Sequence, residues 1–448
     1  MPKSKSRVTV HSTLTVVSDI PVKPGKTYPL SVLDHAMGFH TLHIVFYYRY
    51  NRLESRDSSD LGRLRESLSE ILSYYPPVTG RLMKVDNGNW EVKCNDAGVR
   101  FLKADVDCTL DEWLRSANGN EERDLTVWEN MPEETKVWSP YRIQMSDFVG
   151  GGLAIGLSCP HMQADPACAT ILMKSWTELY RRIAISHPPF FHPPSLRGRT
   201  DPNTNTTSVK NYEAKSRVEP PTNVKMSTAT FRFSDTVIKK CLLEIQSKCP
   251  NANPFDLLAA LFWSSVVNAR NHTNNKQVSL SIGMDFRKRM HAPLPHGYFG
   301  NALHFSSIST DPIKMEEGGL DYMTEIIHDH LTNIVEEEYW SVIDWFESKK
   351  DEGGKHAPPF QMYGPELTCA NLEHVSAFAA VIDDKKPVHV SYHIGNAEGE
   401  GLILVLPSPE EGFGRTVMVT LPEDQIDQLC KDPAILRLEP TMLISGKL

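Results

Sequence analysis

The sequence has little that could bind a polyanion or cross a membrane. Acidic residues outnumber basic ones, and the formal net charge is −9 over 448 residues. This balance lacks the basic footprint of a nucleic-acid-binding surface, so we expect no nucleic-acid partner. No run of about 18 apolar residues occurs, so we expect no transmembrane segment. The first ten residues are basic and polar without an apolar core, which predicts no secretory signal.

The eight cysteines are too scattered to form a recognisable framework. No two of them make a Cys-x-x-Cys pair, and no group of Cys and His has the spacing of a zinc site. We therefore expect buried, reduced thiols in a cytoplasmic protein, and no bound metal.

The length and the hydrophobic content of 40% suit two domains better than one core. One stretch, 187–224, is rich in Pro, Thr, Asn and charge and poor in aliphatic residues. So long a loop is unusual within a compact domain. We interpret it as a crossover linker between an N-terminal domain, 1–186, and a C-terminal domain, 225–448.

Apolar runs typical of strands alternate with helical periodicity on both sides of this linker. The alternation favours a mixed α/β architecture in each half. Strands are expected at 41–50, 90–94, 151–159, 229–233, 278–284, 388–393, 402–406 and 415–421, and helices at 61–75, 108–118, 167–185, 236–248, 254–270 and 422–430.

The segment from Cys159 to Pro166 lies between a short apolar strand and a long helix and contains His161 and Asp165. A strand-to-helix corner holds side chains rigidly, which suits a catalytic base. Histidine ionises near neutral pH and can accept a proton from a hydroxyl or an amine. Taken alone, the pair fits a buried structural histidine better, because a His followed four residues later by an Asp is common by chance. A metal site is less suited, because no third ligand follows at helical spacing.

A second block begins with Asp285-Phe286-Arg287-Lys288-Arg289 and continues to Tyr298-Phe299-Gly300-Asn301. Gly300 would permit a close backbone approach or a positive φ. The block fits a basic loop after a strand. In a functional interpretation, one of its arginines pairs with a buried carboxylate.

Seven segments, in this order, resemble motifs of the plant BAHD acyltransferases of the HxxxD type, which use acyl-CoA donors. Seven matches in order are far more specific than any single one. The segments are Leu30–Asp34, Leu68–Leu82, Cys94–Val99, His161–Asp165, Phe255–Arg270, Arg287–Asn301 and Gly401–Leu421.

The resemblance implies two chloramphenicol-acetyltransferase-like domains, with mixed sheets and flanking helices, around a central channel. It also implies a monomer in which the segment near 367–381 packs with the N-terminal domain. Acyl-CoA would be a co-substrate rather than a permanently bound cofactor, and a small molecule would be the acceptor.

The same resemblance implies roles for individual residues. His161 would be the general base on the acceptor's hydroxyl or amine. Asp165 would pair with an arginine, for which Arg287 is the candidate, and so shape the loop that holds His161. The substrate and CoA channel would include Tyr298, Gly300, Asn301 and Thr368.

Two segments depart from the usual family pattern. Val381-Ile382-Asp383-Asp384-Lys385 stands where the family has DFGWG, and Thr368-Cys369-Ala370 stands where it often has Thr-Ser-Trp. Both departures, in the C-terminal half, resemble the eceriferum/Glossy-type branch, which is linked to very-long-chain fatty acid elongation for cuticular wax. The main interpretation is an acyl-CoA-dependent acyltransferase. The alternative is a non-catalytic or weakly catalytic accessory protein that binds a fatty-acid elongase condensing enzyme, peripherally at the endoplasmic reticulum.

Overall fold

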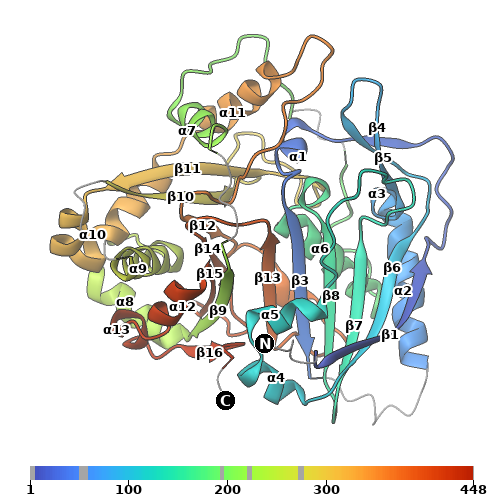
Figure 1. Cartoon of the computed structure of the whole chain (residues 1–448), viewed down its shortest axis with the longest axis horizontal. Helices are drawn as coiled ribbons and strands as arrows, with labels where there is room; N and C mark the ends of the chain where they lie inside the picture. Colours follow the sequence, from blue (N-terminus) through green and yellow to red (C-terminus); the bar gives the residue numbers. More distant parts are fainter. Residues whose placement is uncertain (1–5, 50–58, 192–195, 219–223, 271–276, 447–448) are drawn as a thin grey trace.

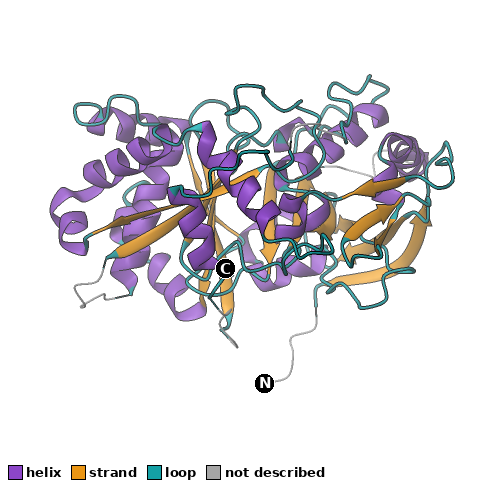
Figure 2. Cartoon of the chain, turned by 90° about the horizontal axis from the view of Figure 1, so that it is seen from above, coloured by secondary structure: helices purple, strands orange, loops and turns teal. Residues whose placement is uncertain are grey.

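The computed structural model describes residues 6–49, 59–191, 196–218, 224–270 and 277–446. Two large mixed sheets lie side by side along the longest axis of the molecule, with helices packed against them (Figures 1 and 2). This arrangement confirms the predicted mixed α/β class with two sheets and flanking helices.

The first sheet belongs mainly to the N-terminal half and has the strand order β1-β6-β7-β8-β3-β13. Only β6 and β7 are parallel neighbours. Its strands are β1 (Val8–Val16), β3 (Thr41–Tyr48), β6 (Val99–Val106), β7 (Arg142–Phe148), β8 (Leu153–Pro160) and β13 (His389–Gly395).

Both faces of this sheet are covered, because alternate side chains of a strand point to opposite sides. Ile44 and Phe46 of β3 join a core with helices α2 (Ser59–Tyr74) and α6 (Pro166–Tyr180). The intervening Val45 joins a second core with helix α4 (Leu110–Ser116).

The second sheet belongs to the C-terminal half and has the order β11-β10-β12-β14-β15-β9-β16. Helix α9 is buried along nearly its whole length in the core beneath this sheet. The strands are β9 (Met226–Phe233), β10 (Val278–Asp285), β11 (Leu303–Thr310), β12 (Thr368–Asn371), β14 (Leu402–Pro407), β15 (Arg415–Pro422) and β16 (Thr441–Leu443). The helices around it are α8 (Asp235–Ile245), α9 (Pro254–Ala269), α10 (Pro312–Thr332), α12 (Glu423–Leu429) and α13 (Pro433–Leu436).

A small third sheet and several short helices complete the described chain. The sheet has the order β2-β5-β4. These elements are β2 (Thr27–Pro29), β4 (Arg81–Lys84), β5 (Trp90–Lys93), α1 (Val32–Ala36), α3 (Pro76–Thr79), α5 (Gly119–Glu122), α7 (Thr207–Lys215), α11 (Glu336–Ser348) and the 3-10 helices at Arg123–Leu125, His161–Gln163 and Ala377–Ala379.

Strand β13 connects the two halves of the molecule. In sequence it lies between β12 and β14, which are neighbours in the second sheet, yet it pairs antiparallel with β3 of the first (Figure 1). The segment near 367–381 is divided in the same way. Its start, β12, pairs in the second sheet, whereas the carbonyl of Ala380 accepts a hydrogen bond from Tyr48 Oη of β3 at 2.8 Å.

Two local features differ from the sequence expectations. Helix α6 ends at Tyr180 rather than near 185, because Arg182 turns into the left-handed region with φ of 59°. The segment 187–224, interpreted as a linker without regular structure, contains α7. This helix begins after Thr206, whose hydroxyl accepts from Val209 N, and it packs against α11.

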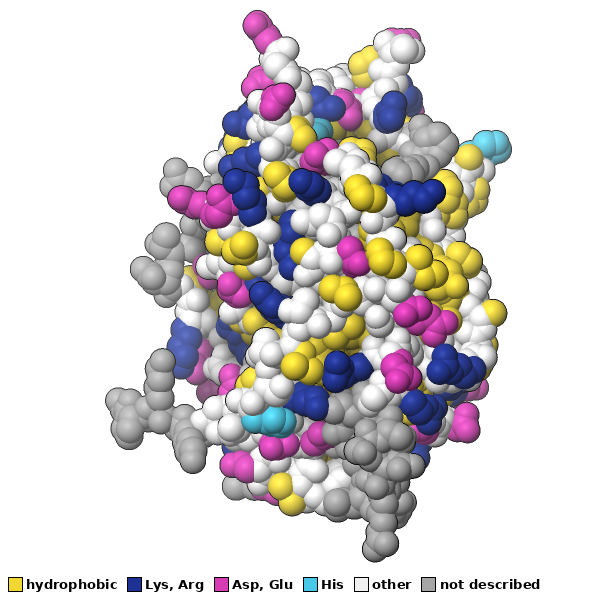
Figure 3. All heavy atoms as spheres, turned by 90° about the vertical axis from the view of Figure 1, so that its right-hand side faces the viewer, with side chains coloured by type: hydrophobic (Ala, Val, Ile, Leu, Met, Phe, Trp, Pro, Cys, Tyr) yellow, Lys and Arg dark blue, Asp and Glu magenta, His cyan; other side chains and the backbone are white. Residues whose placement is uncertain are grey.

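Surface charge is mixed on the face shown in Figure 3. Lys and Arg side chains lie interspersed with Asp and Glu there, without a continuous field of one sign. Within the described chain, no helix is both long and apolar enough to span a bilayer.

Candidate functional site

His161 lies at the corner between β8 and α6, between the two sheets. The chain leaves β8 at Pro160, makes a single 3-10 turn, and enters α6 after Asp165. The backbone N–H of His161 donates to the carbonyl of His40 at 3.0 Å, at the start of β3. The side chain of His161 is fully buried. The backbone at His161 is therefore held between the end of β8 and the start of β3, which are neighbours in the first sheet.

Asn301 determines which nitrogen of His161 carries the proton. Its side-chain amide Nδ2 donates to Asp34 Oδ1 at 2.8 Å and to the carbonyl of His161 at 2.9 Å. Both amide hydrogens are then used, so Oδ1 can only accept, and it lies 3.0 Å from His161 Nδ1. Nδ1 must carry the hydrogen, which leaves the lone pair on Nε2. Burial lowers the pKa of His161, more than Asp165 raises it, which favours this neutral form.

The other ring nitrogen contacts a residue that the sequence analysis gave no role. Tyr363 Oη lies 3.1 Å from His161 Nε2, and the Tyr363 side chain is buried. Since Nε2 carries no hydrogen, the phenol donates. The sequence gave little reason to place Tyr363 here, because the two residues are 202 positions apart.

Asp165 lies at the other end of the corner, and its carboxylate contacts backbone N–H groups and an arginine. It is the N-cap of α6: Oδ1 accepts from Cys168 N at 3.0 Å, and Oδ2 accepts from Ala302 N at 3.1 Å. Arg287 Nη2 lies 2.8 Å from the same Oδ2. The predicted neighbours Asp165 and Arg287 are thus brought together, and none of these contacts points Asp165 at His161.

Arg287 is shared between two carboxylates and a carbonyl. Its Nη1 lies 2.6 Å from Asp285 Oδ2, and its Nη2 donates to the carbonyl of Gly300 at 2.7 Å. Burial opposes ionisation of Asp285, but Arg287 and His374 together hold its pKa below the ordinary value. The end of β10 and the residues just after it therefore carry a compact charged cluster next to the His161 corner.

The other residues expected in the channel have mainly supporting contacts. A Cβ at Gly300 would come within 2.5 Å of Tyr298 Oη, so glycine is needed for that ring to pack. The hydroxyl of Thr368 accepts from Gly364 N at 3.1 Å and donates to the carbonyl of Glu366 at 3.2 Å. Thr368 thus supports the turn that follows Tyr363, and neither of these two bonds involves His161.

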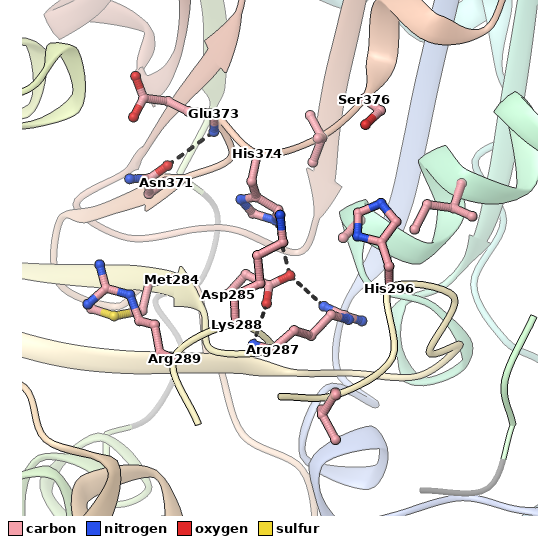
Figure 4. A pocket seen from close by; sticks show the side chains of 14 residues that line it. Met284, Asp285, Arg287, Lys288, Arg289, His296, Asn371, Glu373, His374 and Ser376 are labelled. Carbon is pink, nitrogen blue, oxygen red and sulfur yellow. Dashed lines mark hydrogen bonds and ion pairs between the residues drawn. The ribbon is translucent and has the colours of Figure 1, made fainter. Parts of the chain in front are cut away.

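A cavity of about 410 Å³ opens beside the cluster of Asp285 and Arg287 (Figure 4). In the close-up, Asp285 lies between Arg287 and His374, whose Nε2 is 3.1 Å from Asp285 Oδ2. The lining includes the nitrogen-bearing side chains of Arg287, Lys288, Arg289, His296 and His374, and the carboxylates of Asp285 and Glu373. Arg287 is already paired with two carboxylates, so Lys288 and Arg289 are the cations that suit an anionic ligand.

The segment that replaces DFGWG forms a tight turn away from His161. Asp383 and Asp384 both have positive φ, of 43° and 61°. Tyr180 Oη, at the end of α6, donates to Asp383 at 3.0 Å. Asp165 begins this 15-residue helix, so at 1.5 Å per residue the turn contacts it about 22 Å from the site. The changed motif therefore touches the far end of α6, not the His161 corner.

Among the residues that the structure describes, no group of His, Cys, Asp and Glu could hold a metal ion. All eight cysteines are buried, as the sequence predicted, and none is in a disulfide.

The two linked sheets, with a His-x-x-x-Asp corner between them, define the two-domain acyltransferase class. The structure superposes on that of vinorine synthase with a TM-score of 0.74, covering 98% of this chain and 100% of that one at 18% identity. TRI101 of F. sporotrichioides, complexed with coenzyme A and T-2, gives a TM-score of 0.73 over 94% of this chain and 100% of that one, at 13% identity. At these identities the likeness shows the fold.

A model of the Transferase family matches residues 6–435, so the chain belongs to this family of BAHD acyltransferases and is a transferase. The resemblance seen in its motifs is thereby confirmed. Shikimate O-hydroxycinnamoyltransferase of Nicotiana tabacum is 26% identical, with 86% of this chain and 89% of that protein covered. Protein ECERIFERUM 2 of Arabidopsis thaliana is 25% identical, with 93% and 95% covered. The chain is similar to both branches at nearly equal identity.

Proposed function

We propose that the chain transfers an acyl group from an acyl-CoA thioester to the hydroxyl or amine of a small molecule, with His161 as general base. One observation carries this proposal. Asn301 fixes the hydrogen on Nδ1 of His161, so Nε2 keeps the lone pair that a general base needs. The family membership supports acyl transfer as the reaction class.

The chemistry follows from that lone pair. Nε2 takes the proton of the acceptor as the acceptor's oxygen or nitrogen bonds to the thioester carbon. The tetrahedral intermediate then collapses, the C–S bond breaks, and the imidazolium returns the proton to the CoA sulfur. Such a base contributes about 10²- to 10⁴-fold in rate. No covalent intermediate on the protein is needed.

The donor would enter through the cavity in Figure 4. CoA carries several phosphates, and Lys288, Arg289 and His296 line this cavity. Arg287 also lines it, and through Asp165 it connects the cavity wall to the corner that holds His161. TRI101, which has the same fold, is complexed with coenzyme A, and this supports a CoA thioester as the donor.

The test is the release of CoA thiol from a panel of acyl-CoAs with hydroxyl and amine acceptors. We expect turnover by the wild-type chain and a loss of about 10²- to 10⁴-fold in His161→Ala. His11→Ala, which changes an exposed histidine of β1, is the matched control and keeps full activity. Equal activity of His161→Ala and the wild type would contradict the proposal.

A second function is favoured by the changed motifs and by the similarity to ECERIFERUM 2 over 93% of the chain. Here the chain assists the elongation of very-long-chain acyl groups by binding an elongase condensing enzyme. Co-expression with such an enzyme should lengthen the acyl products, and His161→Ala should do so equally well. Unchanged chain lengths would contradict this alternative.

A further inference from the structure

Both ring nitrogens of His161 are occupied in this structure. Nδ1 donates to Asn301, and Nε2 accepts from Tyr363 Oη at 3.1 Å. His161 and Tyr363 have exposed fractions of 0% and 2%. The lone pair that the proposed reaction requires is therefore engaged by a side chain of the same protein.

The ring of Tyr363 is held by aromatic neighbours. It packs edge-on against Phe305, with ring centroids 5.1 Å apart, and against His40 at 5.2 Å. His40 Nδ1 donates to the carbonyl of Gly395 at 3.0 Å, which leaves Nε2 to accept from Met362 N, also at 3.0 Å. Burial raises the pKa of Tyr363 well above its ordinary value, so the phenol keeps its hydrogen and stays a donor.

The backbone on the other side of Tyr363 is fixed by Lys215, the last residue of α7. Lys215 is buried, and its Nζ donates to the carbonyls of Met362 at 2.8 Å and Gly364 at 3.2 Å. The same Nζ forms an ion pair with Glu366 at 2.6 Å. Because the turn is held on both flanks, displacing the hydroxyl from Nε2 requires the side chain, and not the backbone, to move.

We propose that Tyr363 is a gate residue on the base: its hydroxyl occupies Nε2 of His161 at rest, and the acceptor's hydroxyl or amine must displace it. This inference rests on the proposed acyl transfer. The gate adds a competitor for Nε2, which weakens acceptor binding without changing the bond-making step. A net hydrogen bond of ordinary strength corresponds to about 2- to 13-fold in an equilibrium constant.

The test is Tyr363→Phe, which keeps the ring and its contacts and removes only the hydroxyl. We expect KM for the acceptor to fall about 2- to 13-fold, with kcat unchanged. Tyr392→Phe is the matched control. It loses one buried hydroxyl, bonded to Thr170 at 2.7 Å, and leaves both kinetic constants as they are.

Two results would overturn the gate. A drop in kcat of about 100-fold or more at constant KM would make Tyr363 a proton relay between acceptor and base. A lower Tm with unchanged kcat and KM would make the hydroxyl merely structural.

A spectroscopic measurement separates the gate from the reaction itself. In substrate-free protein labelled with ¹⁵N-histidine, the Nε2 resonance of His161 is assigned by its absence in His161→Ala. Tyr363→Phe should shift this resonance, because the phenol bond is lost, whereas Tyr392→Phe should not. An unchanged Nε2 resonance would refute the gate even if acyl transfer is observed. A chain that shows the shift but has no turnover would refute the proposed function and not the contact.

Discussion

The amide of Asn301 and the imidazole of His161 hold each other in one orientation, with Oδ1 3.0 Å from Nδ1 and Nδ2 2.9 Å from the histidine's own carbonyl. In Asn301→Ala the ring loses its Nδ1 partner, and either nitrogen can carry the hydrogen. We expect the rate of CoA release to fall about tenfold or more. Asp34 also loses a hydrogen-bond partner, so the free energy of unfolding should fall by about 1–3 kcal/mol.

The control for this variant is Asn253→Ala, which removes the N-cap of α9 in the second sheet's core. This substitution should lower the free energy of unfolding by about 1 kcal/mol and leave the rate of CoA release unchanged. Equal kinetic effects of the two variants would show that Asn301 acts only through stability.

Asp165→Ala tests the buried ion pair with Arg287. The substitution leaves a buried guanidinium with one carboxylate fewer and removes the cap of α6. We expect the free energy of unfolding to fall by about 3–5 kcal/mol, measured by denaturant titration. Asp432→Ala, which removes a half-buried cap of α13, should cost only about 1 kcal/mol. Similar losses in both variants would argue against a special role of the pair.

The pH dependence of the reaction follows from the lowered pKa of His161. A general base works only when deprotonated, and burial holds its pKa below the ordinary 6.5. The active range should therefore extend to more acidic pH than for a free imidazole. We expect kcat/KM to stay constant as the pH falls through 6.5 and to decline only below it. A decline centred at or above 6.5 would be inconsistent with this burial.

Stability should fall on acidification, in part through His389. Burial, and after it the guanidinium of Arg232, whose Nη2 lies 3.1 Å from Nδ1, together lower its pKa to about 3. Between pH 6.5 and 3 the unfolded chain binds a proton here that the folded chain does not. The free energy of unfolding should thus fall as the pH drops through this window, by at most about 1.4 kcal/mol per pH unit. His389→Gln should flatten the curve, and parallel curves would contradict the assignment.

The shared strand predicts that the chain cannot be divided at 187–224. A fragment 1–224 lacks β13. Strand β3, whose residues Leu42–Tyr48 are buried in the whole chain, then becomes an exposed edge of the first sheet. Such an edge promotes aggregation. We expect this fragment to be insoluble alone and to become soluble when co-expressed with 225–448. A monomeric, folded 1–224 would show that β13 is dispensable.

The sequence predicted local structure well where periodicity and turn residues agree. The corner from β8 to α6 and the antiparallel strands β14 and β15 were predicted within a few residues. The strand at 388–393 was also expected, but not its pairing with β3. Pairing is decided by packing between distant segments, which no local pattern contains.

The same limit applies to the site. The motif containing His161 was evident, and the contact of Asp165 with Arg287 could be predicted from the family resemblance. Tyr363 and Lys215 could not, because their sequence surroundings predict only a turn and a polar linker. Both act through contacts with backbone or side chains more than 65 positions away. Asp34 was part of a matched motif, yet its bonds to Asn301 had no local signal.

The chain passes from β12 in the second sheet to β13 in the first sheet and returns to the second sheet at β14. The two sheets are therefore joined by one covalent connection before β13 and a second one after it. A hinge between the two sheets would leave the seven paired positions of β13 with β3 in place and would have to bend the connections on both sides of this strand at once. Two connections that must bend together restrict the directions in which one sheet can turn against the other.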